Sequence, residues 1–259
     1  MIEIVKEKYF WEIKLNRPEL HNAFNPEMIS AITEFFIDAS KNSEIRYIYL
    51  TGNGKSFCAG ADLNWMKSMA QYSKAENAKD AKVLFDMFDS MSNCPVPIVS
   101  KVQGNVYGGG IGLVAASDIV AAEKNTKFCF SEVKWGLSPA TISPFVLNKM
   151  TEAKALEYML TAKRFSAKEA LKSNLIHYVS DESDVEDYLS SIKESLVENG
   201  PQALRFTKRL VNEQKYWTED QIKMKTANII AECRVGEEGQ AGLNYFLTKE
   251  IPSWKPSEK

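Results

Sequence analysis

The stretch TGNGKSFCAGADL, residues 51–63, carries the clearest structural signal in the chain. It follows the mostly apolar run at 45–50, which has the composition of a strand, and it leads into a predicted helix. Its glycines allow the backbone to turn sharply and to approach a ligand closely. A strand, a glycine-rich turn and a helix in this order predict an α/β fold.

A second glycine-rich stretch, GNVYGGGIG at 104–112, follows a predicted strand at 97–102 and leads into a short apolar helix at 113–116. Both stretches could be tight turns and nothing more. They could also place free N–H groups at a helix N-terminus, where two such groups aimed at one oxygen form an oxyanion hole. Neither stretch has the spacing of a phosphate-binding loop or of a dinucleotide-binding fingerprint.

The flanking sequence repeats the alternation of strands and helices. Strand formers occupy residues 9–15, and Asn25 followed by Pro26 is typical of a helix start. Pro95 and Pro97 end a second apolar helix, and short strands are predicted at 119–121 and 128–130. This irregular recurrence predicts an α/β fold built of stacked turns.

From about residue 144 the pattern becomes helical, with capping boxes beginning at Ser166 and Thr218. No low-complexity linker interrupts it. The pair Gly200–Pro201 is the best candidate boundary, which divides the chain into a core at 1–200 and a C-terminal helical region at 201–259.

The composition excludes several classes of protein. The chain has 259 residues and a net charge of −2, without the clustered basic stripe of a nucleic-acid-binding surface. Its four cysteines form no C-x-x-C pair, which favours reduced thiols and a cytoplasmic location. The N-terminus lacks a signal sequence, no apolar run is long enough to span a membrane, and no cluster has the spacing of a metal site.

Four motifs occur in a fixed order: LNRP at 15–18, NAF at 22–24, FCAGADL at 57–63 and YGGG at 107–110. With them the chain resembles the enoyl-CoA hydratase/isomerase (crotonase) superfamily over essentially its full length. The segments at 61–66, 128–137 and 139–144 are further similar to those of bacterial methylglutaconyl-CoA hydratases.

The resemblance implies an α/β crotonase-like spiral of ββα turns with a C-terminal helical trimerisation region, assembled as a homotrimer or a dimer of trimers. It implies an oxyanion hole made by the N–H groups of Ala61 and Gly109, and CoA as part of the substrate without any other cofactor. The family's acid/base carboxylate corresponds to Glu132. From the residues alone, Glu132 could equally be a surface glutamate at the end of a strand.

The family's second glutamate is absent, because Gly112 stands at its position. Glu132 would then act alone, or Asp62 would supply the missing carboxylate, or the reaction is not hydration. We favour Glu132 acting alone with Asp62 as a helper. Asp62 is also a good candidate for the N-cap of the helix that follows it.

The resemblance also implies the residues that contact the acyl-CoA. Phe246 and Lys249 of the C-terminal segment would close on the nucleotide, from the same or a neighbouring subunit, although Lys249 also fits a solvated helix end. Trp65, Tyr107 and Trp135 would line the acyl pocket or simply pack in the core. The remaining predicted contacts are Ala23, Phe57, Ala59, Ala61, Asp62, Leu63, Asn64, Gly108 and Gly109.

The predicted function is hydration of a branched 2-enoyl-CoA, with 3-methylglutaconyl-CoA of leucine degradation as the best candidate. Alternatives within the superfamily are an isomerase, a decarboxylase or a carrier-protein dehydratase. An RNA-binding or acyl-CoA-binding protein without catalytic activity is the alternative of a different class, and the net charge argues against the first of these.

Overall fold

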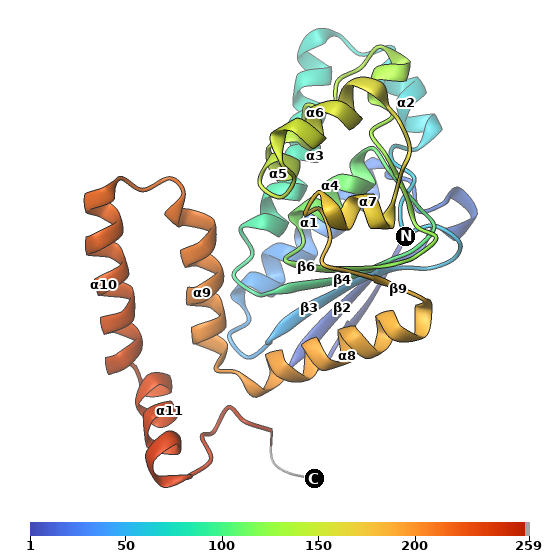
Figure 1. The fold of residues 1–259 in the computed structure, drawn as a ribbon. Helices are drawn as coiled ribbons and strands as arrows, with labels where there is room; N and C mark the ends of the chain where they lie inside the picture. Colours follow the sequence, from blue (N-terminus) through green and yellow to red (C-terminus); the bar gives the residue numbers. More distant parts are fainter. Residues whose placement is uncertain (257–259) are drawn as a thin grey trace.

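The computed structural model describes residues 1–256 and builds them around two β-sheets (Figure 1). In the larger, six-stranded sheet, β1 pairs antiparallel with β2 and all other neighbours are parallel. Its strands, in spatial order, are β1 (Ile2–Lys6), β2 (Phe10–Leu15), β3 (Tyr47–Gly52), β4 (Ile98–Val102), β6 (Ile119–Glu123) and β9 (Tyr178–Ser180).

The smaller sheet has three strands, β5 (Asn105–Tyr107), β7 (Lys127–Cys129) and β8 (Phe165–Ser166). The chain passes from the larger sheet to the smaller one within each turn: β4 leads to β5 and then to helix α4 (Gly109–Ala116). In the next turn β6 leads to β7 and the 3-10 helix η2 (Glu132–Trp135). This arrangement confirms the predicted spiral of ββα turns.

The main core lies between one face of the larger sheet and the helices α1 (Pro26–Lys41), α3 (Lys74–Ser92) and α4. Helix α1 begins as predicted, with the Asn25 side chain accepting a hydrogen bond from the Met28 amide at 2.9 Å. Alternate residues of β2 point into this core. Smaller elements complete this side: η1 (Pro18–Leu20), α2 (Leu63–Met69), α5 (Ser143–Leu147), α6 (Glu152–Thr161) and α7 (Ala167–Lys172).

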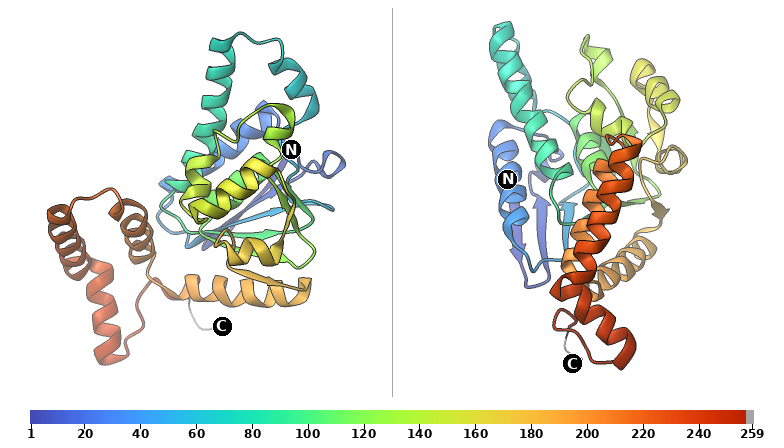
Figure 2. Two further views of the ribbon diagram at one scale, coloured as in Figure 1. Left: turned by 45° about the horizontal axis from the view of Figure 1, so that its top comes forward. Right: turned by 90° about the vertical axis from the view of Figure 1, so that its left-hand side faces the viewer.

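Helix α8 (Glu182–Glu198) crosses the opposite face of the larger sheet (Figure 2). A second, smaller core lies beneath it, formed by Tyr47, Val99, Ala121, Val185, Leu189 and Leu196. The sheet therefore carries apolar side chains on both faces, as buried parallel strands usually do.

Three helices, α9 (Pro201–Gln214), α10 (Glu219–Val235) and α11 (Glu237–Thr248), lie beside the body and extend away from it (Figures 1 and 2). None of their residues is buried. The capping boxes predicted at Ser166 and Thr218 are both present. The chain turns helical from about residue 144 as predicted, but the prediction missed two short strands, β8 and β9, within that stretch.

Both missed strands are too short for a periodic pattern. Strand β8 has two residues, one of which is the buried Phe165, and β9 has three half-buried residues. Their backbone pairing with β7 and β6 places them in the sheets, and their own side chains give no alternation to detect. No helix among residues 1–256 is long and apolar enough to cross a membrane.

Candidate active site

The two glycine-rich stretches lie side by side, joined by backbone hydrogen bonds. The Tyr107 amide donates to the Cys58 carbonyl at 2.9 Å, and the Cys58 amide donates to the Asn105 carbonyl at 3.2 Å. Glycine is required for this close approach: a Cβ on Gly110 would lie only 2.4 Å from the Cys58 carbonyl oxygen. The stretches are therefore a packed pair and not two independent turns.

The Ala61 and Gly109 amides are left free by the local backbone. On either side of Ala61, Phe24 donates to the Gly60 carbonyl and Asp62 donates to the Phe24 carbonyl, each at 2.7 Å. The Ala61 N–H therefore points to the opposite side of this extended segment. Gly109 is the first residue of α4, where N–H groups have no partner within the helix. Within residues 1–256 neither amide donates to a backbone carbonyl.

Glu132 lies against Gly108 of the second stretch, at the point where Gly60 of the first stretch also approaches. A Cβ on Gly108, whose φ is 49°, would stand 3.2 Å from Glu132 Oε1 and 3.9 Å from the Gly60 Cα. The other oxygen, Oε2, is buried and has no hydrogen-bond partner within the described part of the chain. Burial raises the pKa of the Glu132 carboxyl above its ordinary value, because the charged form loses solvation.

Apolar side chains occupy the space beside Gly112. A Cβ at this position would lie 2.6 Å from Phe88 Cζ and 2.7 Å from Ile142 Cγ2. Both of these side chains are buried in the main core. A side chain at residue 112 would therefore overlap Phe88 and Ile142, and the atoms nearest to its Cβ are all apolar.

Asp62 is the N-cap of α2, as one of the two predictions for it stated. Its Oδ1 accepts from the Asn64 amide at 2.8 Å, and its Oδ2 accepts from Arg17 Nη2 at 2.8 Å. Burial acts to raise the pKa of Asp62, but the Arg17 guanidinium and the backbone amides hold that pKa below its ordinary value. With both oxygens engaged, a proton-transfer role for Asp62 stays a prediction that the geometry does not favour.

Two residues to which the sequence analysis gave no role secure this arrangement. Arg17 also donates from Nη1 to the Ala23 carbonyl at 2.7 Å. The fully buried Asn22 donates to the carbonyls of Asn53 and Ser56, each at 2.9 Å, and accepts from the Arg17 amide. Arg17 lies in the LNRP motif and Asn22 in the NAF motif, so the signal that could have identified them is a polar side chain within each motif.

The other predicted acyl-CoA contacts differ in how far their side chains are exposed. Leu63 and Asn64 are exposed at the start of α2, and the half-buried Ala59 donates from its amide to the His21 carbonyl at 3.0 Å. Phe57 is fully buried in the main core, so only its backbone can reach a ligand.

The C-terminal contacts lie apart from these residues. Phe246, which is 75% exposed, and Lys249 belong to the end of α11, on the opposite side of the molecule from α2 (Figure 1). A single chain therefore does not bring them to Ala61, so a neighbouring subunit would have to supply this contact, and the solvated helix end also stays open for Lys249.

The three candidate pocket residues differ as well. Trp65 is buried and donates from Nε1 to Asp80 at 3.3 Å. The half-buried Tyr107 donates its hydroxyl to Asn105 Oδ1 at 2.8 Å, and Trp135 is 68% exposed. Trp65 thus belongs to the core, whereas Tyr107 and Trp135 remain available near Glu132.

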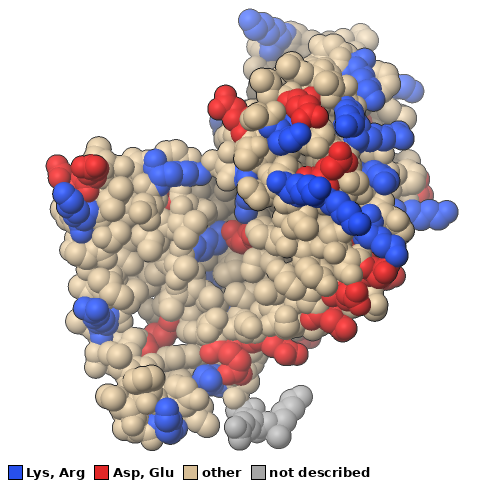
Figure 3. Space-filling model, viewed as in Figure 1, with Lys and Arg blue, Asp and Glu red and all other residues tan. Residues whose placement is uncertain are grey.

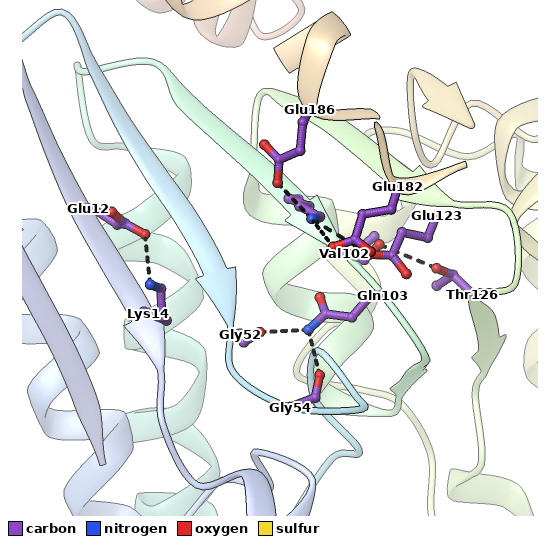
Figure 4. A network of polar contacts seen from close by, with 11 residues as sticks. Glu12, Lys14, Gly52, Gly54, Val102, Gln103, Glu123, Thr126, Glu182 and Glu186 are labelled. Atoms are coloured by element: carbon purple, nitrogen blue, oxygen red, sulfur yellow. Dashed lines mark hydrogen bonds and ion pairs between the residues drawn. The ribbon is translucent and has the colours of Figure 1, made fainter. Parts of the chain in front are cut away.

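A polar cavity of about 590 Å³ lies on the α8 face of the larger sheet and includes none of these residues. Lys101 lines this cavity, with Nζ 2.7 Å from Glu186 and 3.3 Å from Glu182, and Figure 4 shows these two glutamates close together. Nearby, Gln103 donates to the carbonyls of Gly52 and Gly54, which fixes the turn of the first glycine-rich stretch. Within residues 1–256 no group of three His, Cys, Asp or Glu residues is placed to hold a metal ion.

Known proteins resemble this chain in sequence and in fold. Residues 6–257 match the family described as enoyl-CoA hydratase/isomerase. An enoyl-CoA hydratase of Alternaria alternata is 30% identical over 247 residues, which cover 94% of this chain and 80% of that protein. The short-chain-enoyl-CoA hydratase of Clostridium acetobutylicum is 27% identical, over 92% of this chain and 90% of that protein.

Among solved structures, the crystal structure of an enoyl-CoA hydratase from Shewanella pealeana matches with a TM-score of 0.93 and 36% identity. The match covers 98% of this chain and 95% of that chain, so it includes the C-terminal helices as well as the two sheets.

The ion pair between Arg17 and Asp62 is expected to stabilise the site strongly. Replacing Arg17 by Met leaves a buried carboxylate without its cation, which typically costs about 3 kcal/mol. Urea unfolding at pH 7 measures this loss. The pKa of Asp62 is lowered in the folded state. The stabilisation by the ion pair is therefore fully present above pH 3.8, the ordinary pKa of Asp, and is lost as the pH falls through the lowered pKa of folded Asp62.

The matched control is Lys14→Met, which removes a more exposed pair with Glu12 at 3.5 Å and should change stability by less than about 1 kcal/mol. An R17M variant no less stable than the K14M variant would contradict the assigned role.

Gly112→Ala should be destabilising because the added methyl overlaps Phe88 and Ile142. Overpacking of this kind costs about 1–3 kcal/mol. Combining G112A with Phe88→Leu should recover part of the loss, since the ring atoms nearest the new methyl are removed. Thermal or urea unfolding of the two single variants and the double variant measures the coupling, and purely additive losses would argue against the overlap.

Proposed function

The chain belongs to the enoyl-CoA hydratase/isomerase family, and we propose that it adds water to a branched 2-enoyl-CoA thioester, with 3-methylglutaconyl-CoA as its substrate. One observation carries the proposal. The Glu132 carboxylate, whose buried Oε2 has no hydrogen-bond partner among residues 1–256, lies against Gly108, where the two glycine-rich stretches with the free amides of Ala61 and Gly109 meet.

The two amides would bind the thioester carbonyl oxygen. When water adds to the β-carbon, negative charge develops on this oxygen as an enolate forms. Fixed N–H donors stabilise that charge without having to reorganise, and one such donor is typically worth about 10²–10³ in rate. Ala61 is held by the capping of α2 through Asp62, and Gly109 by the start of α4.

Glu132 would carry both proton transfers. Its carboxylate accepts a proton from water while the water oxygen bonds to the β-carbon, and it then delivers a proton to the α-carbon of the enolate. Burial raises the pKa of Glu132, which makes its carboxylate a stronger base than an exposed glutamate. With Phe88 and Ile142 filling the space beside Gly112, no second carboxylate divides this work.

The choice of 3-methylglutaconyl-CoA, and with it a place in leucine degradation, is supported by the likeness at 61–66, 128–137 and 139–144. These segments contain α2, η2 and the loop that brings Ile142 to Gly112. An enoyl-CoA isomerase is the second candidate, because a single carboxylate suffices to move a proton between two carbons. CoA itself would lie along Ala23, Ala59, Leu63 and Asn64 and is part of the substrate.

Assembly as a homotrimer, or as a dimer of trimers, completes the proposal. Helices α9 to α11 bury no residue within one chain and expose many apolar side chains, among them Val211, Met224, Val235, Leu243, Phe246 and Leu247. Contact with neighbouring copies would remove this surface from water, which favours association. The same contact would carry Phe246 and Lys249 to the nucleotide of a neighbouring site.

Glu132→Gln tests the chemistry, because it keeps the shape of the side chain and removes the base. We expect kcat for hydration of 3-methylglutaconyl-CoA and crotonyl-CoA to fall by about 10²–10⁴. In heavy-oxygen water the wild-type product should carry the label in its new hydroxyl, whereas an isomerase product would not. Near wild-type turnover of both substrates by E132Q would remove Glu132 from the mechanism.

The pH dependence gives an independent check. Glu132 acts in its ionised form, so kcat/KM should fall as the pH decreases through its pKa, which lies above the ordinary 4.5. The matched control is Glu152→Gln on the exposed start of α6, which should change neither the rate nor this limb.

Assembly is tested by adding charge to the exposed apolar surface of helices α9 to α11. Met224→Glu with Leu247→Glu should reduce the mass measured by light scattering from a trimer or hexamer towards a monomer. Ile4→Glu, at an exposed apolar position on β1, is the control and should keep the assembly. A wild-type protein that is monomeric at high concentration would overturn this part of the proposal.

A further inference from the structure

Arg164 is an exposed cation beside Tyr107 of the second glycine-rich stretch, and the proposed chemistry does not use it. It lies between α6 and β8, in a segment held on both sides. The carbonyl of Ala162 accepts from the Cys129 thiol at 3.3 Å, and the ring of Phe165 stacks on Phe128 in the core. The backbone of Arg164 is therefore fixed while its side chain is exposed.

The Arg164 guanidinium lies over the ring of Tyr107, with Cζ 5.7 Å from the ring centroid. That ring is itself oriented by the hydrogen bond from its hydroxyl to Asn105. Tyr107 immediately precedes Gly108, the residue whose missing Cβ would stand 3.2 Å from Glu132 Oε1. Arg164 thus borders the site on the side of the carboxylate.

Lys134 is a second exposed cation, two residues after Glu132 in η2. Burial raises the pKa of the Cys129 thiol, the positive charges of Lys134 and Arg164 act to lower it, and Glu132 acts to raise it. The backbone places these charges near this thiol, because Glu132 lies three residues after Cys129 and Arg164 two residues after Ala162, whose carbonyl accepts from Cys129 Sγ. Among residues 1–256 neither Lys134 nor Arg164 forms an ion pair with a carboxylate.

Further cations lie nearby, together with the exposed Glu157 and the half-buried Glu169. Lys163 precedes Arg164, and Lys168 and Lys172 follow on α7, all of them exposed. Figure 3 shows lysines and arginines gathered over the upper half of the body, with acidic side chains along its lower edge, where α8 lies in Figure 1. An anionic group near Glu132 would therefore meet an attractive potential.

We propose that Arg164, assisted by Lys134, binds a carboxylate at the far end of the acyl chain and so selects dicarboxylic acyl-CoA thioesters. This inference rests on the proposed function, because Glu132 identifies the acyl end of the site. A guanidinium stacked on an aromatic ring presents its planar edge to a carboxylate and can form two parallel hydrogen bonds with it. Within residues 1–256 neither Arg164 nor Lys134 has an ion pair that would have to break before a substrate carboxylate binds.

The experiment measures binding of two saturated acyl-CoA esters that cannot be hydrated, glutaryl-CoA with a terminal carboxylate and butyryl-CoA without one. Titration calorimetry of the full chain at low salt gives both Kd values, since exposed charges are screened at high salt. Arg164→Gln should weaken glutaryl-CoA binding by about tenfold and leave butyryl-CoA binding unchanged. Arg164→Lys should keep part of the preference, and Lys134→Gln should lose less than R164Q.

The matched control is Lys163→Gln, which removes the same charge one residue away, where the side chain is weakly paired with Glu169 at 4.0 Å. It should change neither Kd. Equal weakening of both esters by R164Q would mean that Arg164 acts on CoA or on the fold, and no weakening of either would mean that it binds nothing. Both results overturn the inference.

Turnover separates this inference from the proposed function. If wild-type protein fails to hydrate 3-methylglutaconyl-CoA yet prefers glutaryl-CoA through Arg164, the hydratase assignment fails and carboxylate recognition stands. If it hydrates 3-methylglutaconyl-CoA but R164Q binds glutaryl-CoA as wild type does, the hydratase assignment stands and the role of Arg164 is rejected.

Discussion

The hydrogen bond from the Tyr107 amide to the Cys58 carbonyl is the contact on which the rest of the site depends. It draws two glycine-rich stretches together so closely that Gly110 has no room for a side chain. The amides of Ala61 and Gly109 then remain free, on backbone already held by a capped helix and a helix start. Rigid sheets supply the framework, and the turns between them carry the chemistry.

Two buried carboxylates stand within this small region and their surroundings shift the pKa of each in opposite directions. Asp62 receives the Arg17 guanidinium and stays charged, so its contribution is to position α2 and Ala61. Glu132 lies in an apolar setting with an unpartnered oxygen, so its pKa is raised. Such a division, one carboxylate for structure and one for proton transfer, is a common solution in enzyme sites.

The sequence predicts those features of the fold and the site that depend on neighbouring residues. Asn25 with Pro26, Ser166 and Thr218 begin helices because caps depend on neighbours within a turn. The short strands β8 and β9 were missed because distant pairing alone makes them strands. The glycine stretches and Glu132 were recognised by motif, but the burial of Phe57, the roles of Arg17 and Asn22, and the neighbours of Gly112 depend on long-range packing.

The packing around Gly112 also limits how this site can evolve. A carboxylate at residue 112 would need space that the rings and methyls of Phe88 and Ile142 now fill, and it would need polar partners that neither residue offers. Changing Gly112 first would overfill the core, and trimming Phe88 or Ile142 first would leave a void. The single-carboxylate arrangement is therefore separated from a paired one by unstable intermediates, which would tend to keep lineages of this chain on the chemistry they have.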